Sequence, residues 1–471
     1  MEEKYVLSID LLDEIKENKN DKNIKEAENR KLIINNVFAD FGVKAEVTDY
    51  SVGPTVTRFN VTYNQNVSMK MIANLVSDMQ IRLGGIPVRF ESTTLGKTTS
   101  GLEVANEYLN AVCFKELYQE LPDADEHPLA FAFGKDVDNK VAWFDLDKAP
   151  HILISGTTGS GKSVFLNSLI VTLMMRNKPE DLKFMLFDPK FVEFSRYKNM
   201  PHLLCPIIRD NQEAKQYLDK LEEEMYHRYE LFIDKGCSNV QEYNEDAIKY
   251  GFNKLPYIIV IIDEYADLVD FNKEVSYPLI SLAQKARASG IHVIVATQRP
   301  ATNVVTGVLK ANLPLHMALM TASMIDSLTI LGEGGAEKLL GRGDMLVQHP
   351  YVSKLGVVRY QGCYISRNEI TNVLNYLKEK YQTVYSFDCS FAKEPVKEEN
   401  KDEPINDPEE ERYQKIKEWA LKQEYVSISL IQRECAVGFN RASRAFLRLQ
   451  KEGVVSETPD GRKGCLVIKP N

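Results

Sequence analysis

The chain has 471 residues, of which 44% are hydrophobic and 27% charged, and these are proportions of folded globular domains. Its 67 acidic residues exceed its 58 basic residues, so the net charge is −9 and any surface for nucleic acid must be local. The length predicts two to four domains, and no apolar run approaches the roughly 18 residues that would span a bilayer.

The amino-terminal segment, residues 1–35, is charged and weakly patterned, which predicts a helix followed by a mobile stretch. It is acidic at its start and lacks the basic and then apolar segments of a secretory leader. The seven cysteines are scattered and form no CxxC pair, which argues against a disulfide framework or a structural zinc site. A reducing, cytoplasmic location is therefore expected.

Residues 36–140 read as a small α+β domain. In residues 55–63, apolar and polar side chains alternate with the period of a half-buried strand: Phe59, Val61 and Tyr63 against Arg58, Asn60 and Thr62. Ser68 is placed to cap a helix whose apolar face is Ile72, Leu75, Val76, Met79 and Leu83. Val88–Glu91 predicts a further strand.

Residues 141–387 change character, because short apolar strands alternate with long amphipathic helices. The strands read HILIS, KFMLFD, YIIVIID and IHVIVAT, and they are separated by intervals long enough for crossover helices. Continuous apolar strands of this kind are typical of a parallel sheet that is covered on both faces. This part of the chain is therefore expected to be an α/β domain.

A glycine-rich segment follows the first of these strands. GTTGSGKS, Gly156 to Ser163, fits the pattern G-x-x-x-x-G-K-[ST] and precedes an apolar helix, which favours a phosphate-binding P-loop over a merely structural turn. Lys162 would reach the β- and γ-phosphates of ATP, and the Ser163 hydroxyl would bind Mg²⁺. The predicted nucleotide-binding residues are Gly156, Thr157, Thr158, Gly159, Ser160, Gly161, Lys162, Ser163 and Val164.

Acidic and amide side chains end two other strands. The strand YIIVII delivers Asp263, a predicted Mg²⁺ ligand, and Glu264, placed to polarise the attacking water. A simpler reading has these acids only ending a strand or capping a helix. Gln298, at the end of IHVIVAT, could sense the γ-phosphate, orient the water or serve a structural role. Together with Lys162, these residues predict a magnesium-dependent ATPase.

The carboxyl-terminal part of the chain begins with an acidic, proline-containing stretch at 388–410 that is expected to be a linker. Residues 411–471 regain periodicity and predict helices at Tyr413–Lys422, from Ser429 and at Asn440–Glu452, then a hairpin that turns at PDGRKG. Three helices and a hairpin describe a winged helix-turn-helix.

Several strings, in order along nearly the whole chain, resemble the FtsK/SpoIIIE family of bacterial double-stranded DNA translocases. Four strings of this chain resemble the motor domain of the family: HILISGTTGSGKSVFLNSLI, FDPKFVEFSRYKNMPHL, LAQKARASGIHVIVATQRPATNVVTGVLKANLP and GGAEKLLGRGDML. FGVKAEV, VGPTVTRF and LGKTTSGLEVAN resemble the small domain before the motor, and VSISLIQRECAVGFNRASR resembles the winged helix after it.

The resemblance implies an α domain, a RecA-like β domain and a carboxyl-terminal γ domain. In this family the first two assemble into a homohexameric ring that drives duplex DNA through its channel. The γ domain binds short polar DNA sequences that set loading and direction, and it can contact a site-specific recombinase. By the motif match, nucleotide roles pass to Lys162, Ser163, Asp263, Glu264 and Gln298, and DNA contact passes to Arg433, Asn440 and Arg441.

The sequence departs from the family pattern at its start and at two arginine positions. The family's membrane helices, which anchor relatives in the cell membrane at the division septum, are not found here, so either an excised motor or a naturally soluble member is expected. His316 stands where the family has the arginine of Pro-Thr-Arg, and Leu328 where it has that of Asp-Ser-Arg-Thr. The arginine that acts on a neighbour's nucleotide is therefore open among Arg342, Arg299 and Arg287.

Three functions compete on this sequence. The first is an ATP-driven duplex-DNA translocase for chromosome segregation at division or sporulation. The second is a secretion ATPase of the same family, which would move protein, although such enzymes string several ATPase modules together and have no winged helix. The third is a nucleotide-responsive DNA-binding regulator, against which Glu264 and the motor motifs argue.

The segment GFNRASRAFLRLQ at 438–450 is the predicted DNA-reading helix. Residues 411–471 contain 12 basic and 7 acidic side chains, so this end is locally basic. Ala442, Ala445, Phe446 and Leu449 would form its buried stripe and leave Asn440, Arg441, Arg444 and Arg448 toward a DNA groove. The full set of predicted DNA contacts is Arg433, Asn440, Arg441, Arg444, Arg462 and Lys463.

Overall fold

The computed structural model describes residues 5, 7–14, 20–91, 99–350, 352, 356–387, 408–435, 442, 445–446, 448–450, 452–459 and 465–467. The chain forms two compact units, 1–392 and 393–471. Across the described ranges, no helix combines the length and apolar character needed to cross a membrane.

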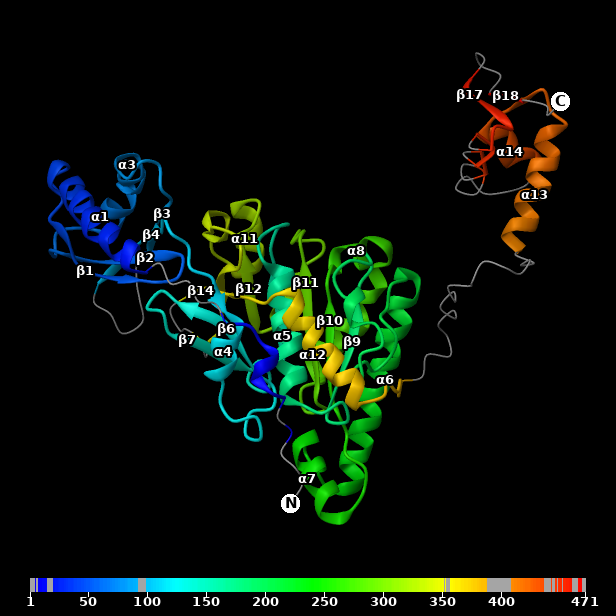
Figure 1. Ribbon diagram of the computed structural model, residues 1–471, viewed down its shortest axis with the longest axis horizontal. Helices are drawn as coiled ribbons and strands as arrows, with labels where there is room; N and C mark the ends of the chain where they lie inside the picture. Colours follow the sequence, from blue (N-terminus) through cyan, green and yellow to red (C-terminus); the bar gives the residue numbers. More distant parts are fainter. Residues whose placement is uncertain are drawn as a thin grey trace. The chain divides into compact units, whose positions relative to one another are not determined.

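The larger unit begins with a small α+β domain (Figure 1). Its antiparallel sheet has the order β1 (Ala45–Val52), β2 (Val56–Tyr63), β4 (Ser100–Ala105) and β3 (Val88–Glu91). Three helices pack on this sheet: α1 (Asn20–Asp40), α2 (Met69–Asn74) and α3 (Val76–Arg82). Helix α1 buries Ile34 and Phe38 in the domain core, so the boundary expected at residue 36 falls inside a helix and the domain begins earlier.

The local predictions for this domain hold with two differences. Ser68 caps α2 by accepting a hydrogen bond from the Met71 N–H, but the expected single helix is divided into α2 and α3 at Leu75. Strand β2 is central, and its predicted outward residue Arg58 is only 1% exposed. The Arg58 guanidinium pairs with Glu91 beneath Gly101, where a Cβ would lie 2.6 Å from it. A buried ion pair therefore breaks the expected alternation.

A nine-stranded mixed sheet organises the rest of the larger unit, in the order β7-β6-β14-β13-β12-β8-β11-β10-β9. Its parallel strands are β8 (His151–Ser155), β9 (Leu182–Phe187), β10 (Tyr257–Ile262), β11 (Ile291–Thr297) and β12 (Leu315–Leu319). Antiparallel strands extend it: β6 (Ala130–Asp136), β7 (Val141–Asp145), β13 (Asp344–Gln348) and β14 (Val358–Gln361). The expected parallel sheet is thus only its centre, and the boundary expected at 140/141 divides the β6–β7 hairpin.

Helices cover both faces of this sheet (Figure 1). One core joins it to α5 (Lys162–Arg176) and α12 (Arg367–Lys380). The other joins it to α6 (Asn211–Lys235), α8 (Tyr265–Phe271), α9 (Ser276–Lys285), α10 (Gly307–Asn312) and α11 (Met324–Leu331). Helix α4 (Phe114–Gln119) follows β5 (Val112–Cys113), which pairs with β15 (Cys363–Tyr364), and α7 (Val240–Tyr250) packs in a satellite cluster. The parallel strands are apolar throughout because both faces are buried.

The smaller unit contains α13 (Pro408–Leu421), β16 (Tyr425–Val426), α14 (Ile428–Glu434), β17 (Val455–Pro459) and β18 (Cys465–Val467). Its strands form a sheet in the order β16-β18-β17, with the predicted hairpin as β17 and β18. Ala442, Ala445 and Leu449 are buried in its core, as the predicted stripe requires, and Phe446 packs against it. The hairpin turn and nearly all of the expected 388–410 linker lie outside the described residues, but Pro408–Glu410 already belong to α13.

Candidate functional site

The glycine-rich segment connects the end of β8 to the start of α5, as the sequence predicted. Gly159 (φ 80°) and Gly161 (φ 106°) adopt left-handed conformations that favour glycine. A Cβ on Gly161 would lie 2.3 Å from the Gly343 nitrogen, so the loop packs closely on the turn before β13. The Gly343 N–H donates to the Ser160 carbonyl at 2.7 Å and thereby fixes this contact.

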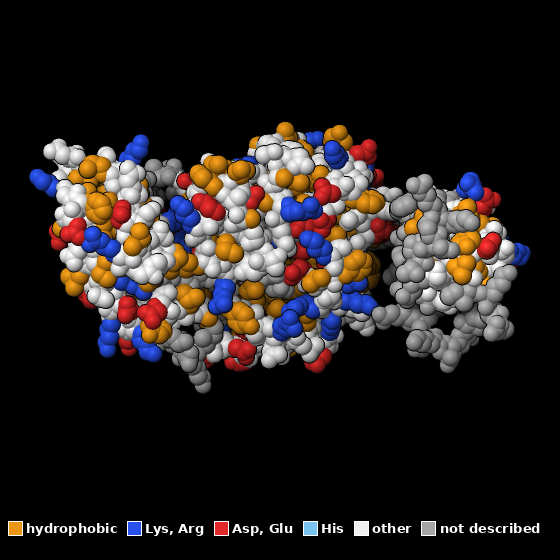
Figure 2. Space-filling view, turned by 90° about the horizontal axis from the view of Figure 1, so that it is seen from above, with side chains coloured by type: hydrophobic (Ala, Val, Ile, Leu, Met, Phe, Trp, Pro, Cys, Tyr) orange, Lys and Arg blue, Asp and Glu red, His pale blue; other side chains and the backbone are white. Residues whose placement is uncertain are grey.

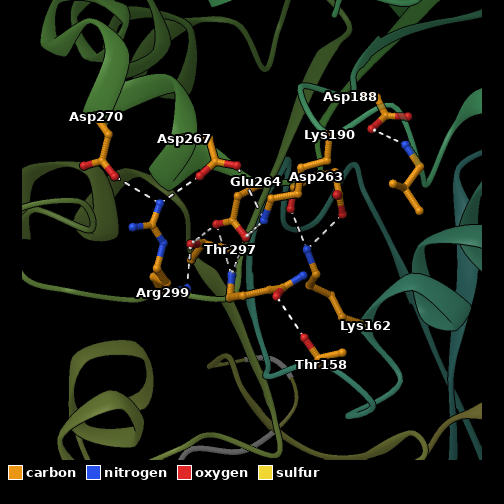
Figure 3. A network of polar contacts seen from close by, with 12 residues as sticks. Thr158, Lys162, Asp188, Lys190, Asp263, Glu264, Asp267, Asp270, Thr297 and Arg299 are labelled. Atoms are coloured by element: carbon orange, nitrogen blue, oxygen red, sulfur yellow. Dashed lines mark hydrogen bonds and ion pairs between the residues drawn. The ribbon is translucent and has the colours of Figure 1, made fainter. Parts of the chain in front are cut away.

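Lys162, at the amino-terminus of α5, meets Asp263, which follows the carboxyl end of β10. The Lys162 Nζ donates to the Asp263 Oδ1 at 2.9 Å and to the Asp263 carbonyl at 2.5 Å (Figure 3). The two side chains are 3% and 1% exposed. Because water screens such a pair little, Lys162 stays on Asp263 until another anion competes for it.

Glu264 is fully buried, and both of its carboxylate oxygens are engaged (Figure 3). The Thr297 hydroxyl donates to Oε1 at 2.6 Å, and the Gln298 N–H donates to Oε1 at 3.1 Å. Lys190 Nζ donates to Oε2 at 3.1 Å. Glu264, the predicted general base, is thus positioned by Thr297 and Gln298 at the carboxyl end of β11 and by Lys190 in the loop after β9.

Lys190 lies in the Asp-Pro-Lys segment, to which the sequence assigned no role. Asp188 shapes the loop by accepting hydrogen bonds from the N–H groups of Val192 and Phe194. Burial opposes the charge on Lys190, but Glu264 and Asp267 raise the pKa of its ammonium above the ordinary value. Sequence reasoning missed both Lys190 and Thr297, although each is adjacent to, or within, a motif already singled out.

A cavity of about 550 Å³ opens beside the glycine-rich loop. It is lined by eight of the predicted residues: Thr157, Thr158, Gly159, Gly161, Lys162, Ser163, Val164 and Gln298. The Thr158 hydroxyl donates to the Gln298 Oε1 at 3.2 Å. Gly156 and Ser160 are buried behind this wall, and among the described residues the Ser160 hydroxyl has no hydrogen-bond partner. The other walls, which sequence reasoning missed, include Leu109–Val112 and Tyr364.

A buried charge cluster connects the α+β domain to the turn that packs on the glycine-rich loop. Arg359 of β14 donates to both carboxylate oxygens of Asp344, at 2.8 and 2.6 Å, and to Glu103 of β4 at 2.7 Å. Arg89 of β3 donates to the same Glu103 oxygen at 3.0 Å. Although burial opposes it, the two arginines hold the pKa of Glu103 at about 2.

Of the residues at the two positions where the family has arginine, His316 has hydrogen-bond partners and Leu328 is exposed. His316 lies in β12 and contacts Gln348 Oε1 and the Lys310 carbonyl, each at 3.2 Å. Burial lowers the pKa of His316, so it is a neutral side chain here and does not replace a cationic arginine. Leu328 is 42% exposed on α11, beside the exposed Met324 and Ile325.

The predicted DNA contacts are only partly described. Arg433, on α14, is exposed and pairs with Glu434 at 2.8 Å. Arg448, expected to lie toward a groove, instead donates to Glu452 at 3.0 Å and lies 3.9 Å from the centre of the Tyr413 ring. The remaining predicted contacts lie outside the described residues: Asn440, Arg441, Arg444, Arg462 and Lys463.

Two further features of the described residues are the distribution of surface charge and the state of the cysteines. On the face in Figure 2, basic and acidic side chains are interspersed over the larger unit. The six described cysteines are free thiols, and in the described ranges no three His, Cys, Asp or Glu side chains are grouped to hold a metal.

The strand–loop–helix with Lys162, the acids ending β10 and the covered parallel strands define a P-loop ATPase domain of the RecA-like α/β type. It is combined with a small α+β domain and a winged-helix unit. The model of the FtsK/SpoIIIE family matches residues 115–302, that of the FtsK alpha domain matches 7–106, and that of the Ftsk gamma domain matches 407–464.

Relatives of known name agree with these matches. DNA translocase FtsK of Streptococcus pneumoniae is 40% identical over 447 residues, which is 93% of this chain and 57% of the relative. DNA translocase FtsK of Lactiplantibacillus plantarum is 40% identical over 425 residues, which is 89% of this chain and 53% of the relative. A solved structure of the pCW3 conjugation coupling protein TcpA, in its monomer form with ATPgS, shares the fold with a TM-score of 0.50 and 22% identity, covering 74% of this chain and 99% of TcpA.

The chain belongs to the FtsK/SpoIIIE family and carries its alpha, ATPase and gamma domains. It spans little more than half the length of the two FtsK relatives. Membership in this P-loop family implies ATP as the nucleotide.

Proposed function

We propose that this chain is an ATP-driven double-stranded DNA translocase that works as a homohexameric ring in chromosome segregation. The carrying observation is the combination on one chain of the Lys162, Asp263 and Glu264 site with FtsK-type alpha and gamma domains. A DNA-reading unit joined to a motor distinguishes this function from protein secretion. The catalytic Glu264 site argues against a regulator in which hydrolysis is incidental.

ATP fits the cavity chemically. The loop contains glycines in left-handed conformations and leads into a helix whose amino-terminus is Lys162. The Lys162 ammonium is paired with Asp263. When triphosphate enters, its charge competes for the Lys162 ammonium, which then leaves Asp263. Release of Lys162 frees the Asp263 carboxylate for a cation.

Magnesium is the cofactor that we assign to Ser163 and Asp263. One hydroxyl and one carboxylate would hold Mg²⁺, which takes few protein ligands in nucleotide sites. When bound, Mg²⁺ would neutralise part of the negative charge of the phosphates. Glu264 would accept a proton from the attacking water, and Gln298, hydrogen-bonded to Thr158, would orient that water near the γ-phosphate.

The winged-helix unit would guide loading and direction on DNA. Arg433, Asn440 and Arg441 are proposed to read base edges, and Arg444, Arg462 and Lys463 to contact phosphates. Its second proposed partner is a site-specific recombinase.

The test measures ATP hydrolysis and triplex displacement on linear duplex DNA of increasing length. We expect hydrolysis to rise strongly with long duplexes, and displacement to require ATP. Lys162→Ala should abolish both while the circular dichroism spectrum is retained. No stimulation and no displacement at any DNA length would refute a translocase.

A further inference from the structure

The three arginines that the sequence left unranked are placed very differently. The Arg299 guanidinium is bound by two acids of α8 in the same chain. It donates to Asp267 at 2.7 Å and to Asp270 at 3.0 Å. Arg287 precedes β11 and so lies at the amino-terminal end of the parallel strands, opposite to the end that carries the glycine-rich loop. It donates to the Asp147 carbonyl at 2.7 Å. Arg342, in contrast, lines the cavity of its own glycine-rich loop.

The backbone of Arg342 is held on that loop from two sides. Its N–H donates to the Gly159 carbonyl at 3.2 Å, and its own carbonyl accepts from Gln361 Nε2 at 2.9 Å. Gln361 in turn accepts from the Thr55 hydroxyl of the α+β domain at 3.0 Å. Arg342 has a φ of 53°, a left-handed conformation that is uncommon for arginine and requires such support.

The turn itself is anchored by buried charges. The Leu340 N–H donates to Asp344 Oδ2 at 2.7 Å. Asp344 also accepts hydrogen bonds from Nε and one terminal nitrogen of the Arg359 guanidinium. Neighbouring Gly343 donates to Ser160. The position of Arg342 relative to the loop is therefore fixed within one chain.

The Arg342 side chain is exposed, and in the described part of the chain no carboxylate pairs with its guanidinium. The other charged side chains lining the cavity are Lys162, which is occupied by Asp263, and Glu193. A planar guanidinium facing a phosphate-binding loop is suited to bind phosphate oxygens through two parallel hydrogen bonds.

We propose that Arg342 binds the phosphates of the nucleotide held by its own chain, in cis, and does not act on the neighbour's nucleotide. Thr55, Gln361 and the Asp344–Arg359 pair position it. The proposal rests on the proposed function only in taking ATP as the ligand. The trans-acting group of a ring must then come from another residue.

The test uses fluorescence titration with a fluorescent ADP analogue in magnesium buffer, at protein concentrations where sedimentation shows a monomer. Arg342→Asn is the informative variant because asparagine tolerates the left-handed conformation. We expect at least about tenfold weaker binding, a smaller loss for Arg342→Lys, and an unchanged melting temperature. Inorganic tripolyphosphate should compete about tenfold less well in Arg342→Asn.

Arg287→Ala is the matched control and should bind the ADP analogue as the wild type does. Wild-type affinity in monomeric Arg342→Asn would overturn the cis assignment. A loss for the ADP analogue with full tripolyphosphate affinity would overturn phosphate contact. Neither readout uses DNA, so failure of the translocase proposal would leave this result intact, and the reverse is also true.

Discussion

The two residues most important for the proposed chemistry are restrained by their neighbours. Lys162 is bound to Asp263, and Glu264 is bound by Thr297, Gln298 and Lys190. Glu264 is fully buried and does not line the cavity. Hydrolysis therefore requires that the Glu264 carboxylate become exposed to the cavity once the nucleotide has bound there.

Glu264→Gln tests the role of this carboxylate. The amide oxygen can still accept from Thr297, so the fold and ATP binding should persist, but it cannot accept a proton. We expect the hydrolysis rate to fall by about 10²–10⁴-fold. ATP-bound protein should remain on DNA in a dissociation assay, and rapid dissociation with ATP would contradict Glu264 as the base.

The nucleotide-binding residues could be predicted from sequence because a P-loop is a local pattern. Lys162, Asp263 and Glu264 were found from strand ends and spacing alone, and the structure brings them together. Lys190 and the cis placement of Arg342 depend on contacts between distant segments, which no local spacing encodes. The burial of Arg58 was missed for the same reason, because its partner Glu91 is on another strand.

At the scale of elements, strands β4, β13 and β14 are joined by the charges of Glu103, Asp344 and Arg359. All three side chains are nearly inaccessible to water. Such a cluster stabilises only while it is complete, because a lone buried charge is costly. The fold class was predictable from sequence, but this connection was not.

Arg359→Leu should therefore destabilise the larger unit by about 3–5 kcal/mol, because Glu103 and Asp344 lose their shared cation. Urea denaturation followed by tryptophan fluorescence measures this change. The control is Arg82→Ala, which removes an exposed pair with Asp40 and should cost less than about 1 kcal/mol. Equal effects of the two substitutions would show that the cluster adds no stability.

Three buried histidines near the amino-terminal ends of the parallel strands predict acid sensitivity. Burial lowers the pKa of His151 to about 3 and those of His202 and His292 to about 4. The unfolded chain titrates near pH 6.5 and so binds more protons than the folded chain between pH 6.5 and 4. The free energy of unfolding should fall as the pH falls through this window.

His292→Asn tests this pH dependence, because the asparagine amide can still donate to the Pro150 carbonyl that His292 contacts at 3.1 Å. Urea midpoints measured from pH 7 to 4.5 should fall less steeply in this variant. The exposed His227→Asn substitution is the control for replacing a histidine at the surface. A wild-type slope in His292→Asn would contradict the prediction.

At the scale of the whole molecule, the two units have separate cores and separate proposed tasks. The net charge of −9 and the locally basic residues 411–471 are compatible, because the basic segment is small. The sequence predicted a linker at 388–410 from the patterns on either side of it, and the division between the two compact units falls within that range. It did not predict that Arg448 would be engaged by Glu452 and Tyr413.

Arg441→Ala should reduce sequence-directed loading while sparing DNA-stimulated hydrolysis. A chain ending at Ala392 should behave in the same way, because the residues proposed to bind and hydrolyse the nucleotide all lie in the larger unit. Loading is measured by orientation-dependent displacement on DNA that carries the preferred motif. Equal loss of loading and hydrolysis would place the winged helix within the motor itself.

The Glu103–Arg359 contact also limits how this motor can be recombined with other parts. A chimaera that joins residues 114–392 to a foreign amino-terminal domain would leave Arg359 facing whatever residue replaces Glu103. A donor with an acid at that place, and a cation in the role of Arg89, should give a more stable hybrid than a donor without them. Transfer of the two domains as one unit would keep Glu103, Arg89 and Arg359 together.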